Sequence, residues 1–420
     1  MKSSLTFTAK LATWQRWDAV QILRLPAYRH LLLGNILNQM GREARMMAQA
    51  WLILALTNSD AWVGAVVGLP AITAAVMALI SGVLADRFNR RTMLIIIQLV
   101  LTGVALLTML LVAADLIHIW HLLALAFIIS LVDVSGMTAS QTLIMDQAPR
   151  VQLFSANAVY TATNNLAIVV SPALTGLIIA HFGVTHAFGF SVLLFAGALW
   201  AITNLRIATP IPERTDTSIR HDFQEGVHYV RQTPVLRWLM VIGLTVIAVG
   251  VWPVVVPRYA RDVLNAGATG YGAILSARGV GGLVGMITLI SAGNVKRLGR
   301  VLLGCALAFA LLAILFVQTT VLWTAVATSF GLGIIFIWWP ATLRTAVQLS
   351  ATDAMRGRAM GLFSLMMQIL TFGWLVGGLL SDAIGSQLAM MAMAALCAAG
   401  NLLVYMRSAE VRAIGQDGVV

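Results

Sequence analysis

Gly82-Val83-Leu84-Ala85-Asp86-Arg87-Phe88-Asn89-Arg90-Arg91 is a short run of charge between two long apolar segments. Residues 61–80 before it and 93–113 after it are almost free of charged side chains. Each segment is long enough to cross a bilayer, which takes about 20 apolar residues. Because the turn between them is short and rich in arginine, the sequence predicts an antiparallel pair of membrane helices joined on the cytoplasmic side. Charged groups are costly in lipid, so the turn also fixes the depth of both helices.

The whole chain has the composition of a multi-pass membrane protein. Of its 420 residues, 60% are hydrophobic and only 10% are charged, a mixture that no soluble globular domain has. The length accommodates about twelve membrane helices with short loops. The stretch 207–234 contains prolines and many polar residues and cannot span a membrane, so it divides the helices into two sets of six.

This division predicts an all-α membrane fold of two related six-helix bundles around a central path. The predicted parts are a cytoplasmic lead-in over 1–29, a bundle over 30–206, a cytoplasmic linker over 207–234, a second bundle over 235–407 and a cytoplasmic tail over 408–420. The predicted helices span 30–56, 61–84, 92–113, 119–144, 155–180, 185–206, 235–257, 268–292, 299–317, 320–345, 358–381 and 386–407.

The net charge of +11 follows a topological pattern. Lysines and arginines gather in the lead-in, in the linker, in the tail and in loops such as 87–91 and 296–300, whereas the alternate loops contain none. This is the positive-inside rule, and it predicts a plasma (inner) membrane protein with both termini in the cytoplasm. The pattern also argues against a nucleic-acid partner. Arg258 and Arg261 are exceptions, in a predicted external loop.

Catalytic and metal-binding motifs are missing from the sequence. It has no phosphate-binding G-x-x-x-x-G-K-S/T loop, no H-E-x-x-H motif and no nucleophile elbow. The two cysteines, Cys305 and Cys397, lie in apolar segments and are predicted to be small core residues. We therefore expect neither an enzyme nor a bound cofactor or metal. Without a phosphate-binding loop, ATP is not expected to drive the protein, and we expect a proton gradient as its driving force.

The charged turn resembles the signature between the second and third helices of the major facilitator superfamily, G-x-L-A-D-R-x-G-R-R/K-x-x-L. The match runs over residues 82–94, with Asn89 where the family has glycine. The resemblance implies transport by alternating access, with Asp86 as a gate residue that contacts the cytoplasmic start of the eleventh helix and its arginines; the alternative is that Asp86 only anchors the turn. The arginines of the predicted gate are Arg87, Arg90, Arg91, Arg356 and Arg358.

Three further segments resemble the branch of that superfamily that contains the enterobactin exporter and macrolide efflux proteins. They are residues 223–237, 257–272 and 356–360. The resemblance implies export of a small amphipathic molecule, a siderophore or a drug-like compound, by proton antiport. It also implies a monomer whose partners are its substrate and membrane lipid. A lipid or lysophospholipid flippase on the same fold is the alternative.

The predicted first helix carries two polar stripes on an otherwise apolar surface. The first has spacings of i, i+3, i+7, i+10 and i+14, and the second lies about 100° round the helix. Charges near mid-span are tolerated only beside water, a partner or a ligand, so the stripes are predicted to line a transport cavity. The alternative is a structural ion pair with a neighbouring helix. The stripes are Asn35, Asn38, Arg42, Arg45 and Gln49, and Gln39 and Glu43.

Two more charges fall near mid-span, Asp133 in the fourth helix and Arg278 in the eighth. The resemblance implies that both helices approach the cavity. Either Glu43 or Asp133 is expected to carry the coupling proton; the alternative is that arginines neutralise them. The excess of arginine over acid in the membrane favours an anionic substrate, because guanidinium groups pair well with oxyanions; the alternative is a neutral or cationic drug.

Three other side chains are candidate cavity contacts: Asn165, Trp339 and Gln368. For the aromatic one the alternative is plain packing. The fifth helix also contains Ser171-Pro172-x-x-Thr175-Gly176, which resembles the G-P-x-x-G-G element of drug/proton antiporters with two glycines replaced. Both replacements are small, so close helix packing is still expected.

Overall fold

The computed structural model describes residues 26–69, 73, 77, 89–147, 152–204, 219–293, 295, 297–353, 355–369 and 372–414, and they are almost entirely helical. The helices of the first half are α2 (Pro26–Thr57), α3 (Asp60–Gly68), α5 (Arg90–Ala113), α6 (Ile119–Asp146), α7 (Leu153–Phe182) and α8 (Val184–Thr203). Those of the second half are α10 (Pro234–Leu244), η2 (Thr245–Gly250), α11 (Val251–Arg258), η3 (Tyr259–Val263), α12 (Gly267–Ala292), α13 (Leu298–Gln318), α14 (Leu322–Ser350), α15 (Arg356–Ile369), α16 (Phe372–Ile384) and α17 (Ser386–Arg407). The linker contains α9 (Ile219–Gln232), and α18 (Ala409–Ala413) follows the last long helix.

Ten helical spans within the described residues are long and apolar enough to cross a membrane. The first helix, α2, is not among them because Arg42, Glu43 and Arg45 interrupt its apolar length. The predicted second helix is described mainly over α3, at its start. These two helices and the ten spans occupy the twelve expected positions, so the prediction of an all-α membrane protein is confirmed.

The seventh helix is longer than predicted. The elements α10, η2, α11 and η3 follow one another without a break as far as Val263. Arg258 and Arg261 therefore lie in the last turns of a helix, and their predicted placement in a loop was wrong. Charged residues at the end of an apolar segment suggested a loop, but here they have partners that keep the helix intact, as described below.

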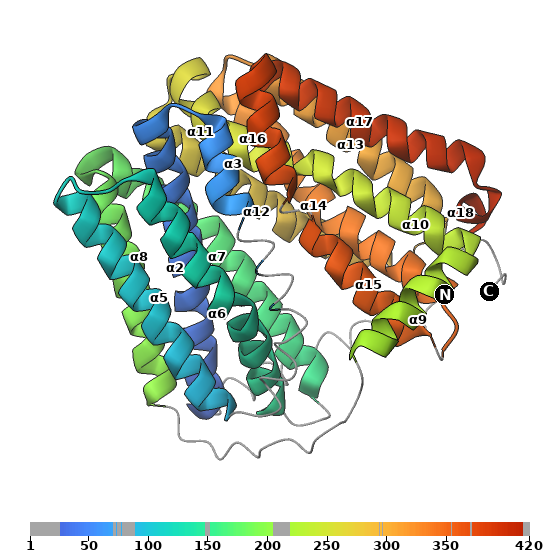
Figure 1. The fold of residues 1–420 in the computed structure, drawn as a ribbon, viewed down its shortest axis with the longest axis horizontal. Helices are drawn as coiled ribbons and strands as arrows, with labels where there is room; N and C mark the ends of the chain where they lie inside the picture. The colour runs from blue at the N-terminus through green and yellow to red at the C-terminus, as the bar shows by residue number, and fades with distance from the viewer. Residues whose placement is uncertain are drawn as a thin grey trace, which may run out of the picture.

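The two halves of the chain form two bundles that lie side by side (Figure 1). They come closest where α3, α11 and α16 meet, and they diverge toward the end that carries α9. We call the first the outer end and the second the inner end, after the predicted topology. Between the bundles, α3 packs on α16 and α7 packs on α12.

Small residues make these inter-bundle contacts close. A Cβ atom on Gly64 of α3 would overlap the backbone of Trp374 in α16. A Cβ atom on Gly272 of α12 would lie 3.2 Å from Cα of Gly176 in α7. Small residues allow helices to approach closely in a membrane. The segment from Ser171 to Gly176 therefore keeps the close packing expected of it.

The outward-facing surfaces are apolar, as a bilayer requires. Trp323, Leu193 and Ile290 are among the most exposed large side chains, at 77%, 72% and 70% of their surface. In the interior of the second bundle, Trp252 is fully buried and its ring lies 6.0 Å from that of Phe316. Apolar residues thus face outward as well as inward, so their positions do not mark a functional site. Polar side chains inside the bundles are rare and are therefore candidates for function.

Candidate functional site

The first polar feature is an ion pair inside the first bundle. The Arg42 guanidinium of α2 donates to the Asp133 carboxylate of α6. Both side chains are largely buried, with 17% and 20% of their surface exposed. Each charge neutralises the other, so for this arginine and this aspartate the arrangement is the structural one of the two alternatives.

The next turn of α2 holds charges that are not paired in this way. Gln39 Nε2 donates to Glu43 Oε1 over 3.0 Å, and Arg45 Nη1 donates to Gln49 Oε1 over 2.7 Å. Both bonds join residues one turn apart on the same helix. Among the described residues, neither Glu43 nor Arg45 forms an ion pair.

Arg278 of α12 brings a cation from the second bundle toward Glu43. The two groups interact electrostatically across the interface. The Arg278 guanidinium carbon lies 5.2 Å from the ring centre of Trp252 and 5.5 Å from that of Phe336. Aromatic faces attract a cation without neutralising its charge. Within the described part of the chain, no carboxylate is bonded to Arg278. We call Glu43 and Arg278 the central pair.

A small cavity with a mixed polar and apolar lining lies next to the Arg42–Asp133 pair, between α2, α5, α6 and α8. Its volume is about 30 Å³, and Asn35, Asn38, Asp133 and Ser140 are among its lining residues. A space of this size with polar groups in its lining holds about one water molecule. Asn35 Nδ2 also donates to Asn164 Oδ1 of α7 over 2.7 Å. The asparagines of the first stripe therefore face a small hollow inside the first bundle.

A larger cavity lies in the second bundle and is apolar. Its volume is about 110 Å³, and η2, α13, α14, α15 and α17 surround it. Trp339 is one of its walls and is 7% exposed. This candidate contact is therefore buried within its own bundle. Both cysteines of the chain line the same space, which agrees with their predicted place in the core.

The other candidate contacts are placed as follows. Asn165 Nδ2 donates to Thr161 O over 2.9 Å and lies 3.8 Å from Met286 Sδ of α12, at the junction of the bundles. Gln368 lies on α15, and its side chain is outside the described part of the structure.

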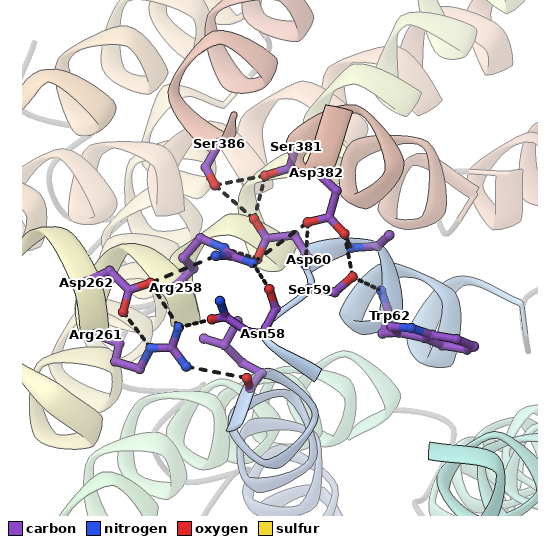
Figure 2. A network of polar contacts seen from close by, with 12 residues as sticks. Asn58, Ser59, Asp60, Trp62, Arg258, Arg261, Asp262, Ser381, Asp382 and Ser386 are labelled. Carbon is purple, nitrogen blue, oxygen red and sulfur yellow. Dashed lines mark hydrogen bonds and ion pairs between the residues drawn. The ribbon is translucent and has the colours of Figure 1, made fainter. Parts of the chain in front are cut away.

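A dense polar network joins the two bundles at the outer end (Figure 2). Arg258 at the end of α11 donates from Nε to Asp60 Oδ1 of α3 over 2.8 Å and from Nη2 to Asn58 O over 2.7 Å. Asp60 is 1% exposed and also accepts hydrogen bonds from the hydroxyls of Ser381 and Ser386. A carboxylate this deeply buried is thus fully satisfied by partners from the other half.

Asp382 of α16 completes the start of α3. Its carboxylate accepts from the backbone N–H groups of Asp60 over 2.9 Å and Ala61 over 3.1 Å, and from the hydroxyl of Ser59. An acid at this position also interacts favourably with the helix dipole. The first turn of α3, in the first bundle, is thereby capped by a side chain of the second bundle.

Arg261 adds a more exposed layer. It pairs with Asp262 and donates to the side chain of Asn58. We call the whole set the outer lock: Asn58, Ser59, Asp60, Arg258, Arg261, Asp262, Ser381, Asp382 and Ser386. Sequence reasoning missed it, although two arginines that violated the positive-inside pattern were a signal for buried acidic partners.

The residues of the predicted inner gate are only partly described. Asp86 and Arg87 lie outside the described residues. Arg90 opens α5, and Arg91 Nη2 donates to Thr203 O at the end of α8 over 2.8 Å. Asn89, the departure from the family signature, caps this helix through its side-chain oxygen, which accepts from the N–H groups of Arg91 and Thr92.

The two arginines at the start of α15 are paired within their own half. Arg356 pairs with Asp353 over 2.6 Å, and Arg358 pairs with Glu225 of the linker helix α9 over 3.0 Å. Glu225 is a partner that the sequence did not suggest. The Arg358–Glu225 pair thus holds the linker helix to the second bundle.

Comparison with known proteins agrees with this architecture. The family profile described as "Transmembrane secretion effector" matches residues 19–417. The chain is similar to the multidrug efflux pump Tap of Mycolicibacterium fortuitum, with 29% identity over 84% of this chain and 88% of that protein. It is also similar to the enterobactin exporter EntS of Escherichia coli O1:K1, with 25% identity over 90% of each chain.

Solved structures show the same fold. The nucleoside transporter NupG has a TM-score of 0.73 at 14% identity, covering 91% of this chain and 99% of that one. A bacterial homologue of the human lysosomal transporter Spinster, in an inward-facing and unoccupied conformation, has a TM-score of 0.72 at 15% identity, covering 92% and 98%. At such identities the likeness concerns the fold alone.

Proposed function

Since the chain belongs to the transmembrane secretion effector family of the major facilitator superfamily, we propose that it exports a small amphipathic molecule in exchange for protons. The family resemblance expected from the charged turn is confirmed, and members are transporters, not enzymes. The observation that carries the proposal is the central pair. Glu43 and Arg278 come from opposite bundles and interact electrostatically, and among the described residues neither has an ion-pair partner.

The transported molecule, in this proposal, binds between these two charges. Arg278 offers donors to a carboxylate or carbonyl oxygen, and Glu43 accepts from a donor group of the same molecule. Trp252 and Phe336 hold the guanidinium in place and leave its charge available. An amphipathic compound with both kinds of polar group fits this arrangement, as siderophores and many drug-like molecules do.

We assign the exchanged proton to Glu43. Asp133, the other candidate, is bonded to Arg42, and protonating it would strand a largely buried arginine. Glu43 accepts only a neutral hydrogen bond from Gln39 among the described residues. A proton and a substrate donor group then compete for one carboxylate, and competition at a single site is what exchange requires.

Alternating access supplies the two directions. In this proposal the substrate enters from the inner end while the outer lock is formed. Opening of the outer lock then releases it. In this proposal the inner end and both termini face the cytoplasm, the protein lies in the plasma membrane, and one chain is the transport unit.

The test compares Glu43→Gln with Asp133→Asn in proteoliposomes. A thermal-stabilisation screen of siderophores, antibiotics and lipids first supplies a ligand, because binding to the folded form raises its stability. Glu43→Gln is expected to abolish substrate-driven proton flux while labelled substrate still exchanges with unlabelled. Asp133→Asn is expected to lower stability but to keep the coupling.

Undiminished coupling in Glu43→Gln, or loss of coupling in Asp133→Asn alone, would refute the assignment of the proton. Stabilisation by lipids and by no other class of compound would favour the flippase alternative.

A further inference from the structure

The apolar cavity of the second bundle is the larger of the two cavities described above. It is lined by carbon and sulfur groups, among them Cys305, Phe309, Phe336, Trp339, Met367 and Cys397. An empty apolar space lowers stability because the atoms around it lose dispersion contacts. A cavity of about 110 Å³ that is kept in spite of this loss is therefore a candidate for occupation.

The residues around the cavity differ in their exposure. Phe309 and Cys397 are each 2% exposed, whereas Phe336, Pro340 and Met367 keep part of their surface accessible. The lining thus combines residues closed to the outside with residues that are partly accessible. A 150 Å³ cavity of this kind holds benzene, so this one is suited to a single ring or a branched alkyl group.

One side chain joins the cavity to the central pair. Phe336 is a wall of the cavity, and its ring centre also lies 5.5 Å from the guanidinium carbon of Arg278. The Arg278 guanidinium and the cavity therefore have Phe336 as a common neighbour. The small cavity in the first bundle has a mixed lining that includes Asn35, Asn38 and Asp133, whereas the lining of this one is almost entirely apolar.

We propose that the apolar cavity is a subsite that takes a ring-sized apolar arm of the exported molecule, beside an acidic or carbonyl oxygen bound by Arg278. This rests on the proposed export function and narrows its substrate class. The compounds selected are those with an aromatic or branched alkyl group directly attached to the oxygen-bearing group. Compounds with the same oxygen group and no such arm are poor substrates.

The two cysteines make the subsite measurable, because both line it and the chain has no others. In Cys305→Ala, the rate of alkylation of Cys397 by N-ethylmaleimide reports whether the cavity is empty. Benzoate at about ten times its dissociation constant is expected to slow this reaction about tenfold, since only the empty form reacts. Acetate, which lacks the ring, is expected to have no effect. Arg278→Gln in the same background should remove the protection by benzoate.

Filling the cavity gives an independent test. Ala306 is 1% exposed and lines the cavity, so Ala306→Leu places extra carbon inside it. The matched control is Gly304→Leu on the same helix, where no atom lies within 4 Å of an added Cβ. Ala306→Leu should slow alkylation of Cys397 and reduce transport of ring-bearing substrates, whereas Gly304→Leu should do neither.

Equal alkylation with and without benzoate would overturn the subsite, as would transport by Ala306→Leu at the rate of Gly304→Leu. Protection of Cys397 that depends on the acyl chains of the surrounding lipid, and not on benzoate, would also overturn it in favour of a lipid chain. If Ala306→Leu fails to fold, the benzoate experiment in Cys305→Ala still tests whether the cavity is a subsite. Export stands separately: substrate-driven proton flux in the unaltered protein tests it whatever the cavity does.

Discussion

The outer lock and the central pair both contain charges from the two bundles. They differ in that the charges of the lock are bonded to charged partners, whereas those of the central pair are not, within the part of the chain that the structure describes. In the lock, Asp60 is 1% exposed and has partners on every side, including Arg258 and two serine hydroxyls. In the central pair, Glu43 and Arg278 have no ion-pair partner among the described residues. Satisfied charges hold a conformation, and charges left without partners are available to a ligand. The predictions below separate these two roles.

The largest effect is expected from Arg258→Met. The substitution leaves Asp60 buried without its cation, and loss of one partner of a buried pair costs about 3–5 kcal/mol. Because the partners come from different bundles, we expect the cost to fall on the closed outer end. A cysteine introduced at the outer mouth, with Cys305 and Cys397 replaced, should then react faster with a membrane-impermeant maleimide.

Arg261→Met is the matched control. Arg261 and Asp262 are 31% and 41% exposed, and pairs near the surface contribute about 0–1 kcal/mol. Equal labelling of the two variants would show that burial of Asp60 does not hold the outer end closed.

A smaller effect is expected from Gly64→Leu, which tests the close contact beside the lock. A side chain here would overlap the backbone of Trp374, and overpacking costs about 1–3 kcal/mol. Gly103→Leu is the control, because an added Cβ at Gly103 meets no atom within 4 Å. Accessibility of the outer mouth should rise in the first variant only; a rise in both would mean that bulk alone perturbs the helices.

The smallest effect on stability is expected from Arg278→Gln, which tests the other side of the comparison. It removes contacts with Trp252 and Phe336 that contribute about 0.5–2 kcal/mol and breaks no bonded ion pair. Thermal unfolding should therefore change little, while ligand-induced stabilisation should be lost. A large drop in stability with binding retained would make Arg278 a structural residue.

The sequence predicted the fold because the fold depends on local signals. Apolar length, basic loops and the turn at 82–94 each mark a feature within a few dozen residues. The polar stripe of α2 was visible for the same reason. Its division into a bonded pair, Arg42 with Asp133, and an unbonded acid, Glu43, was not visible, because it depends on which residues of α6 and α12 face α2.

The outer lock and the apolar cavity were beyond such reasoning for different reasons. Asp60 and Ser381 are separated by 321 positions, and no periodicity connects them. A cavity is a lack of side-chain volume, so it leaves no motif in the chain. Trp339 was identified as a candidate contact, yet only its neighbours across several helices show that it lines an apolar space.

The cap that Asp382 provides to α3 ties the secondary structure of one bundle to the position of the other. Separation of the outer ends removes that carboxylate from the amides of Asp60 and Ala61, which must then turn to water. Deuterium uptake at these two amides would accordingly become faster as the outer ends spend more of their time apart, so the exchange rate would report the population of the outward-open state.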